Sequence, residues 1–197
     1  MQPKCQVCYL RDRWVPIMSR ARLLIWLSPL HRRSMLYMAP ELAQVPYALV
    51  PSPVSSTDFY DMGLTRSGVL AVNAALMYKG GDLFVEWARA HPEERITLVG
   101  ARPEVEVPPN VQYQGSSAFA EMNRLYNNHK KLLHLSERSQ PFERTIAEAY
   151  LAGCGIVANA NIGALSWPFF KHGRDVVART LEEAPIKFWQ AIEKVRR

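Results

Sequence analysis

The feature that most constrains the fold is an alternation of apolar runs and helical patterns from residue 68 onward. Five short apolar runs span residues 68–74, 95–99, 110–114, 131–135 and 155–160. Helical spacing of apolar residues fills three of the gaps, at 80–91, 116–129 and 144–152. Buried strands that alternate with helices are typical of a parallel sheet covered on both faces. We therefore expect a doubly wound α/β domain with right-handed crossovers, whose ligand binds beyond the carboxyl ends of the strands.

Further elements lie on either side of this alternation. The apolar composition of residues 22–27 and 47–50 indicates two short strands. Between them a helix is expected to open at Ser28-Pro29, because serine is a good cap and proline suits the first helical position. A last helix is expected over residues 182–197.

The net charge of +6 is concentrated in the first 40 residues. That segment holds seven basic side chains and one acidic one, whereas residues 41–197 hold 17 of each sign. A basic segment suits an anionic membrane surface or an acidic partner; nucleic acid ranks lowest because no aromatic-interleaved nucleic-acid module follows. The alternative is a solvated face or a disordered lead-in.

Targeting signals in the sequence are weak. No uninterrupted run of 18 apolar residues exists, and charged residues at 11–13 interrupt any signal-peptide core. We expect a cytoplasmic protein, with peripheral attachment to a membrane as the alternative.

The three cysteines give little support for a metal site. Cys5 and Cys8 have the spacing of half a zinc site or a redox pair, but no second such pair follows. The third cysteine is Cys154, and an odd count argues against a disulfide framework. We expect no metal and no cofactor.

The segment 136–165 carries the clearest functional signal. A Pro141-Phe142 turn leads into a short helix that contains Glu148 and stops at Gly153, where an apolar strand follows at once. A helix N-terminus beside strand ends is a ready anion site, because free N–H groups and the positive end of the dipole meet there. A carboxylate at the same place can accept hydrogen bonds from sugar hydroxyls. Together these groups favour a nucleotide-sugar.

The same segment resembles the donor-binding signature of retaining glycosyltransferases of family 4, which have the two-Rossmann (type B) fold. That signature runs Glu-x7-Glu, with Pro-Phe-Gly inside it and Glu-Ala-x-x-x-Gly at its end. Pro141, Phe142, Glu148, Ala149 and Gly153 match it. The resemblance implies a Rossmann-like domain that binds a nucleoside-diphosphate sugar for metal-independent, hexosyltransferase-type transfer with retention.

The resemblance also implies roles for individual residues. Glu148 would hold the ribose hydroxyls, Gln140 the donor sugar, and Lys79 the diphosphate, together with backbone N–H groups of Phe142 to Thr145. Two alternatives stay open. Thr145-x-x-Glu148 is also a capping-box pattern, and Lys79 can be an ordinary surface lysine before a helix.

Four positions depart from the family pattern, and one of them is Asn73, which stands where a glycine is usual. Gln140 replaces a glutamate and carries no charge, so it can orient a sugar but cannot stabilise a cationic centre. Glu143 replaces a glycine, and we expect its side chain to turn out to solvent. Ala74 stands where a second cationic residue is usual; Arg144 or Arg102 are the candidates to supply that charge.

The remaining candidate residues follow other strands. Gly100 and Arg102, and further along Gly115 and Ser116, match the loops that flank the base in the family. Strand-end residues, including Ser136 and 159–163, are expected to converge on the same crevice. His134, inside an apolar strand, is expected to be a core histidine with its hydrogen bonds satisfied.

The resemblance covers about residues 20–180, which correspond to the donor half of such enzymes. We divide the chain into a basic segment, 1–40, and a nucleotide-sugar-binding domain, 41–197. The segment would be a remnant of an acceptor domain or a docking element for a separate acceptor subunit. The isolated chain is then a transferase domain, active or inactive alone. The alternatives are a non-catalytic nucleotide-sugar binder and an unrelated α/β nucleotide-binding or interaction domain.

Overall fold

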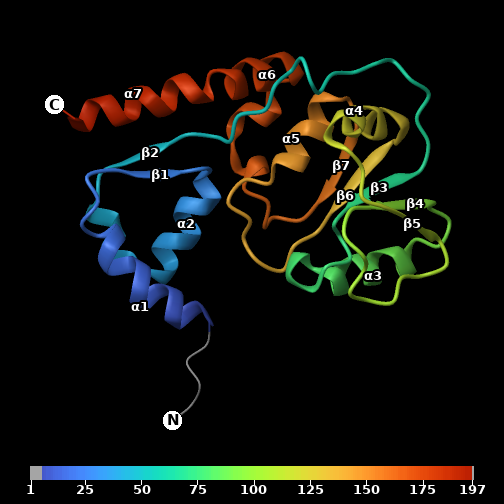
Figure 1. The fold of residues 1–197 in the computed structure, drawn as a ribbon, viewed down its shortest axis with the longest axis horizontal. Coiled ribbons are helices and arrows are strands. Elements are labelled where there is room, and N and C mark those ends of the chain that lie inside the picture. Colours follow the sequence, from blue (N-terminus) through green and yellow to red (C-terminus); the bar gives the residue numbers. More distant parts are fainter. Residues whose placement is uncertain (1–5, 197) are drawn as a thin grey trace, which may run out of the picture.

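The computed structural model describes residues 6–196, with side chains from residue 11 onward. Five strands form one parallel sheet in the spatial order β5-β4-β3-β6-β7 (Figure 1). They are β3 (Val69–Val72), β4 (Ile96–Val99), β5 (Val111–Gly115), β6 (Lys131–His134) and β7 (Gly155–Ala158). Each lies on a predicted apolar run to within one residue. The predicted α/β class is therefore confirmed.

The direction of strand addition reverses between β3 and β6. The chain first adds β4 and β5 on one side of β3, and then returns to add β6 and β7 on the other. In register, Leu70 of β3 lies opposite Thr97 of β4 and Leu132 of β6. The loops that leave β3 and β6 therefore begin at neighbouring strand ends, where the strand order reverses, which is where open α/β sheets bind ligands.

Helix α3 (Gly81–Ala90) covers one face of the sheet. Its Phe84 and Ala88 pack with Val69 and Ala71 of β3 in one buried cluster. Because side chains alternate along a strand, Leu70 between them faces the opposite cluster. The near-continuous apolar character of β3 follows from burial on both faces.

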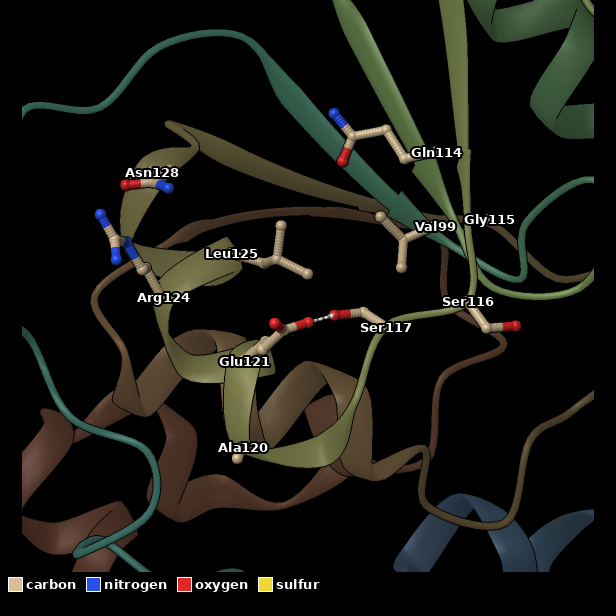
Figure 2. Close-up of a pocket in the computed structure, with 10 residues that line it drawn as sticks. All are labelled: Val99, Gln114, Gly115, Ser116, Ser117, Ala120, Glu121, Arg124, Leu125 and Asn128. Atoms are coloured by element: carbon tan, nitrogen blue, oxygen red, sulfur yellow. Dashed lines mark hydrogen bonds between the residues drawn. The ribbon is translucent and has the colours of Figure 1, made fainter.

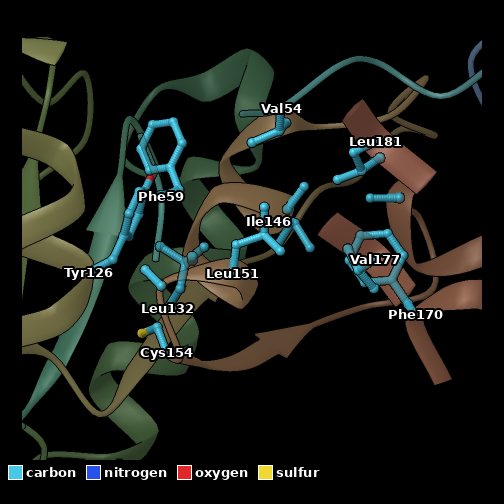
Figure 3. Close-up of a cluster of buried hydrophobic side chains, with 14 of the residues drawn as sticks. Val54, Phe59, Tyr126, Leu132, Ile146, Leu151, Cys154, Phe170, Val177 and Leu181 are labelled. Atoms are coloured by element: carbon cyan, nitrogen blue, oxygen red, sulfur yellow. The ribbon is translucent and has the colours of Figure 1, made fainter. Parts of the chain in front are cut away.

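Helices α4 (Phe119–Asn128), α5 (Arg144–Leu151) and α6 (Arg174–Glu182) cover the other face. Figure 3 shows their shared core, in which Ile146 lies near the centre and Tyr126 lies at one end beside Phe59. Helix α6 was not predicted from the sequence. The short 3-10 turns η2 (Met77–Lys79), η3 (Ala164–Ser166) and η4 (Pro168–Lys171) complete this part of the chain.

Residues 6–50 form a smaller unit with its own core. It contains α1 (Gln6–Met18), β1 (Leu24–Trp26), α2 (Pro29–Met38), η1 (Pro40–Gln44) and β2 (Tyr47–Leu49), with β1 and β2 parallel. Val15 packs in this core, so a disordered lead-in is wrong for the helical residues. The division at residue 40 stays a prediction; β2, which follows it, pairs with β1, which precedes it.

Hydrogen bonds join the small unit to the loop before α5. The Ser28 hydroxyl caps α2 by accepting from the His31 N–H at 3.0 Å, and donates to the Pro141 carbonyl at 2.6 Å. The Trp167 indole donates to the Leu27 carbonyl at 2.9 Å. The predicted Ser28 cap is confirmed, and its hydroxyl also contacts the segment that carries the functional signal.

Helix α7 (Ala184–Arg196) ends the described chain and starts two residues later than predicted, because α6 occupies residues up to Glu182. It runs back over the small unit (Figure 1). A hollow of about 370 Å³ between α7 and β2 is lined in part by Lys187 and Lys194. No helix within residues 6–196 is both long and apolar enough to cross a bilayer.

Candidate functional site

The loops that follow β3 and β6 approach each other closely at Gly80. This residue has φ of 90°, and a Cβ there would lie 3.0 Å from the Leu135 carbonyl oxygen and 3.3 Å from the Ser136 Cα. Glycine therefore fits both the backbone conformation and the space. The approach brings Lys79, just before Gly80, against the loop that opens α5.

Glu143 occupies the centre of this junction. Its Oε2 accepts from the Lys79 Nζ at 3.0 Å and lies 3.6 Å from the His134 Nε2, while its Oε1 accepts from the Thr145 hydroxyl at 3.1 Å. The side chain is only 11% exposed. The expected solvent-facing orientation is wrong, because the Lys79 ammonium and the α5 N-terminus both attract a carboxylate inward.

His134 lies at the end of β6 beneath this carboxylate. It is 2% exposed, and neither ring nitrogen has a hydrogen-bond partner. Its core position is confirmed, but its expected hydrogen-bond satisfaction is wrong. Burial lowers the pKa of His134; the nearby carboxylate of Glu143 opposes this shift and the Lys79 ammonium adds to it. The imidazole is therefore held neutral.

Glu143 is held ionised in this environment. Burial alone would raise the pKa of its carboxyl group, but the Lys79 ammonium and the hydrogen bonds from Lys79 and Thr145 lower that pKa below its ordinary value. The Lys79–Glu143 contact is consequently an ion pair at the carboxyl ends of the sheet. Lys79 is more than a surface residue, since its side chain is 23% exposed.

Glu148 lies one helical turn further along α5. Its Oε2 accepts from the buried Tyr126 hydroxyl at 3.0 Å, and its Oε1 lies 3.6 Å from the Arg144 Nη2. Burial raises the pKa of Glu148, although the hydrogen bond from Tyr126 and the charge of Arg144 partly oppose this shift. Burial likewise raises the pKa of Tyr126. The capping-box alternative is wrong, because Glu143 is the N-cap and Thr145 lies inside the helix.

Gln140 is held by its own loop. Its Nε2 donates to the Ser136 hydroxyl at 2.8 Å, and its backbone bonds to the Asn161 carbonyl at 2.7 Å and the Gly163 N–H at 3.0 Å. Asn161 Nδ2 donates in turn to the Ser136 carbonyl at 2.8 Å. The strand-end residues after β6 and β7 thus converge as expected.

Phe142 contributes to this loop through packing and its backbone. The ring is 2% exposed within the main core, and the carbonyl accepts from the Ala164 N–H at 2.7 Å. A Cβ on Gly163 would overlap the Pro141 carbonyl oxygen. The loop that opens α5 is therefore held by the core, through Phe142, and by the segment that follows β7, through Gly163 and Ala164.

The base-flanking candidates form a second group at the ends of β4 and β5. The Gly100 N–H donates to the Gly115 carbonyl at 2.8 Å, and the Ser116 hydroxyl to the Gly100 carbonyl at 3.4 Å. Asn73, with φ of 52°, ties the β3 end to this group by accepting from the Ala101 N–H at 2.8 Å. Arg102 is exposed, and its contact with a phosphate stays a prediction.

A hollow of about 500 Å³ opens beside this second group (Figure 2). Ser117 donates to Glu121 across its mouth at 2.9 Å, and Arg124 lies along the same helix. Of the predicted site residues, Gly115 and Ser116 line the hollow. The lining is completed by Val99, Gln114, Ala120, Leu125 and Asn128.

The described residues form no group of three or more His, Cys, Asp or Glu that could hold a metal ion. Cys5 lies outside the described residues, as does the side chain of Cys8. Cys154 is buried, and burial raises the pKa of its thiol to about 11. That thiol is protonated at neutral pH and has little nucleophilic character.

Sequence reasoning missed three residues that support the site. Tyr126 counted only toward the helical spacing of residues 116–129, although a buried phenol needs a hydrogen-bond partner. Asn73 was noted only as a departure from the family pattern, although asparagine tolerates positive φ. His134 was expected to be satisfied; an ionisable residue inside an apolar run was the available signal.

No protein-family model and no curated protein sequence matches this chain. Solved structures do. Sucrose-phosphate synthase from Thermosynechococcus elongatus matches 92% of the chain with TM-score 0.63 and 17% identity. HepE from Anabaena, in complex with UDP-glucose, matches 97% with TM-score 0.67 and 16% identity. The pneumococcal O-GlcNAc transferase GtfA, in complex with UDP and GlcNAc, matches 91% with TM-score 0.59 and 14% identity.

This chain spans 55%, 68% and 40% of the lengths of those three chains. At these identities the likeness establishes the fold, a Rossmann-like α/β domain of the kind that forms half of a type-B glycosyltransferase structure.

Proposed function

We propose that this chain is the donor-binding part of a glycosyltransferase and binds a nucleoside-diphosphate sugar at the carboxyl ends of its parallel strands. One observation carries the proposal: Lys79, the N-terminus of α5 and Glu148 meet at the point where strand order reverses. A cation and helix N–H groups suit phosphate, and a carboxylate one turn further suits a diol. The similar structures that hold UDP-glucose or UDP with GlcNAc support this ligand class.

Each part of the ligand has a matching group. Lys79 and the backbone N–H groups that open α5 would offset the diphosphate charge. Glu148, already positioned by Tyr126, would accept hydrogen bonds from the ribose hydroxyls through its second oxygen. The loops at Gly100 and Gly115, beside the 500 Å³ hollow, would flank the base.

The proposed chemistry is hexosyl transfer with retention, without a metal, as the resemblance to family 4 implies. In that reaction the α5 N-terminus and Lys79 would stabilise the negative charge on the leaving diphosphate. Gln140 would orient the sugar through its amide, since it has no charge to stabilise an oxocarbenium-like centre.

A second candidate is a nucleotide-sugar binder without catalysis. The observation that favours it is the neutral Gln140, whose amide is bonded to Ser136 in the same loop. The ligand and its contacts are the same in both candidates, so they differ only in turnover.

An acceptor half would complete the transferase. The chain spans 40–68% of the three matched structures, and residues 1–40 carry the excess positive charge. We propose that this segment docks a separate acceptor domain or an anionic membrane surface.

The proposal predicts that a nucleoside-diphosphate sugar stabilises the chain against heat. A thermal-shift panel that varies base and sugar should give one positive class, worth about 2.7 kcal/mol when the ligand is at about 100 times Kd. Glu148→Ala should abolish the shift, whereas Glu86→Ala, which removes an exposed carboxylate on α3, should keep it. Released sugar measured in the same samples separates a transferase from a binder. A flat panel for the wild-type chain would sink the proposal.

A further inference from the structure

We propose that Glu143 determines which ligand charge the site accepts: its carboxylate occupies the anion position between Lys79 and the α5 N-terminus, and an entering phosphate group must displace it. This inference rests on the proposed function, because it concerns the same crevice. The proposed function uses the backbone N–H groups that open α5, whereas this inference assigns a role to the side chain of Glu143.

The geometry of Glu143 is that of a side chain held in place. Its two oxygens bond separately to Lys79 at 3.0 Å and Thr145 at 3.1 Å. Its backbone has φ of 74°, a left-handed conformation that is unfavourable for a non-glycine residue. The ion pair and the hydroxyl contact offset that strain. The carboxylate thus stays over the strand ends instead of entering solvent.

The charges around the position are already balanced. Within residues 6–196, Lys79 is the cationic side chain bonded to Glu143, and Arg144 is directed to Glu148 at 3.6 Å. A phosphate that approached this neutral pair would meet no excess positive charge while Glu143 remained in place. Removing the Glu143 charge leaves the Lys79 ammonium free to pair with the ligand.

His134 provides the independent observation that this position is built for a ligand. It is buried, has two unpartnered ring nitrogens, and its Nε2 lies 3.6 Å from the Glu143 carboxylate. A buried imidazole without a hydrogen bond is costly. A neutral imidazole has one N–H to donate. When the carboxylate leaves, His134 and Lys79 both face the group that replaces it.

The test compares wild-type chain with Glu143→Gln, titrated with inorganic pyrophosphate in a calorimeter at pH 7.5. Glutamine has nearly the same shape and tolerates the same backbone, so the substitution removes the charge and exchanges one acceptor oxygen for an NH2 donor. We expect Glu143→Gln to bind pyrophosphate about tenfold more tightly, which is the size of one charge-assisted hydrogen bond. Glu137→Gln removes an exposed carboxylate from the same loop and should change affinity less than about twofold. Equal affinities for wild type and Glu143→Gln would overturn the inference.

A second measurement follows ligand binding in the wild-type chain and uses a variant only to assign resonances. In wild-type chain with ¹⁵N-labelled histidine, saturating pyrophosphate should shift the His134 ring resonances, identified by their loss in His134→Leu. Binding that leaves these resonances unmoved would overturn displacement of Glu143. The nucleotide-sugar panel is a separate readout: if it is flat while Glu143→Gln gains pyrophosphate affinity, the proposed function fails and the competition stands. If neither chain binds pyrophosphate, the inference fails.

Discussion

The β3–β6–β7 side of the crevice and its β4–β5 side hold their polar groups in opposite ways. On the first side, Lys79, Glu143 and Gln140 are already bonded to neighbours within the fold. On the second, Arg124 and Gln114 border an open hollow. The first side must exchange interactions to admit a ligand, whereas the second has space in advance.

This difference follows from where each side gets its rigidity. The β6–β7 loops are joined by main-chain and amide bonds between residues 136–140 and 159–163. The β4–β5 loops are joined mainly through Gly100, Gly115 and Asn73. Affinity is therefore expected to depend on charge on the first side and on shape on the second.

The largest expected effect comes from adding one methyl group to each side. Gly163→Ala places a Cβ against the Pro141 carbonyl oxygen and should cost about 3 kcal/mol or more in unfolding free energy. Gly115→Ala meets no atom within 4 Å, so only its φ of 80° is unfavourable, at about 1–2 kcal/mol. Urea denaturation of both variants measures the difference. Equal losses would mean that the α5 loop shifts freely and that the two sides are alike.

A smaller effect is expected from Tyr126→Phe, which removes one oxygen. The Glu148 carboxylate then loses its buried donor, at a cost of about 1.5–3 kcal/mol in unfolding free energy. On the open side, Ser117→Ala removes the exposed hydroxyl bonded to Glu121 and should cost less than about 0.5 kcal/mol. A Tyr126→Phe chain as stable as wild type would show that Glu148 finds another partner.

The smallest effect concerns pH. Because burial lowers the folded-state pKa of His134 below its ordinary 6.5, the unfolded chain binds a proton that the folded chain does not. The contribution of neutral His134 to the free energy of unfolding is therefore fully present above about pH 6.5. It is lost as the pH decreases toward the folded-state pKa, by at most about 1.4 kcal/mol per pH unit for one proton. His134→Leu should flatten this slope between pH 7.5 and 5.5. Burial also lowers the pKa of His31, so His31 accounts for the pH dependence of stability that remains in this variant.

An unchanged slope in His134→Leu would mean that His134 is solvated or protonated in the folded chain. That result would also remove the unpartnered imidazole from the description of the β6 side, and the two sides of the crevice would then differ less than their contacts indicate.

The main sheet was predictable because parallel strands that are buried on both faces have short, continuous apolar sequences. Residues 69–72 and 131–134 are examples, and position along the chain was sufficient to place them. Helix α6 was missed because most of its residues are polar and only Val177 and Leu181 of it are buried. Helix α1 was missed because its apolar residues have only weak helical spacing and it contains Pro16.

The orientation of Glu143 could not be predicted from its neighbours in sequence. Its ionic partner Lys79 is 64 residues away and reaches it only because β3 and β6 are adjacent. The family resemblance located the residue and its positive φ is consistent with the glycine it replaces. The resemblance gave no means of judging which charges would surround a carboxylate there.

The Ser28 hydroxyl gives the crevice a mechanical link to the first fifty residues. It bonds at the same time to the first turn of α2 and to the peptide carbonyl just before Phe142. A ligand that moved residues 140–143 would therefore disturb the first turn of α2 through the same hydroxyl.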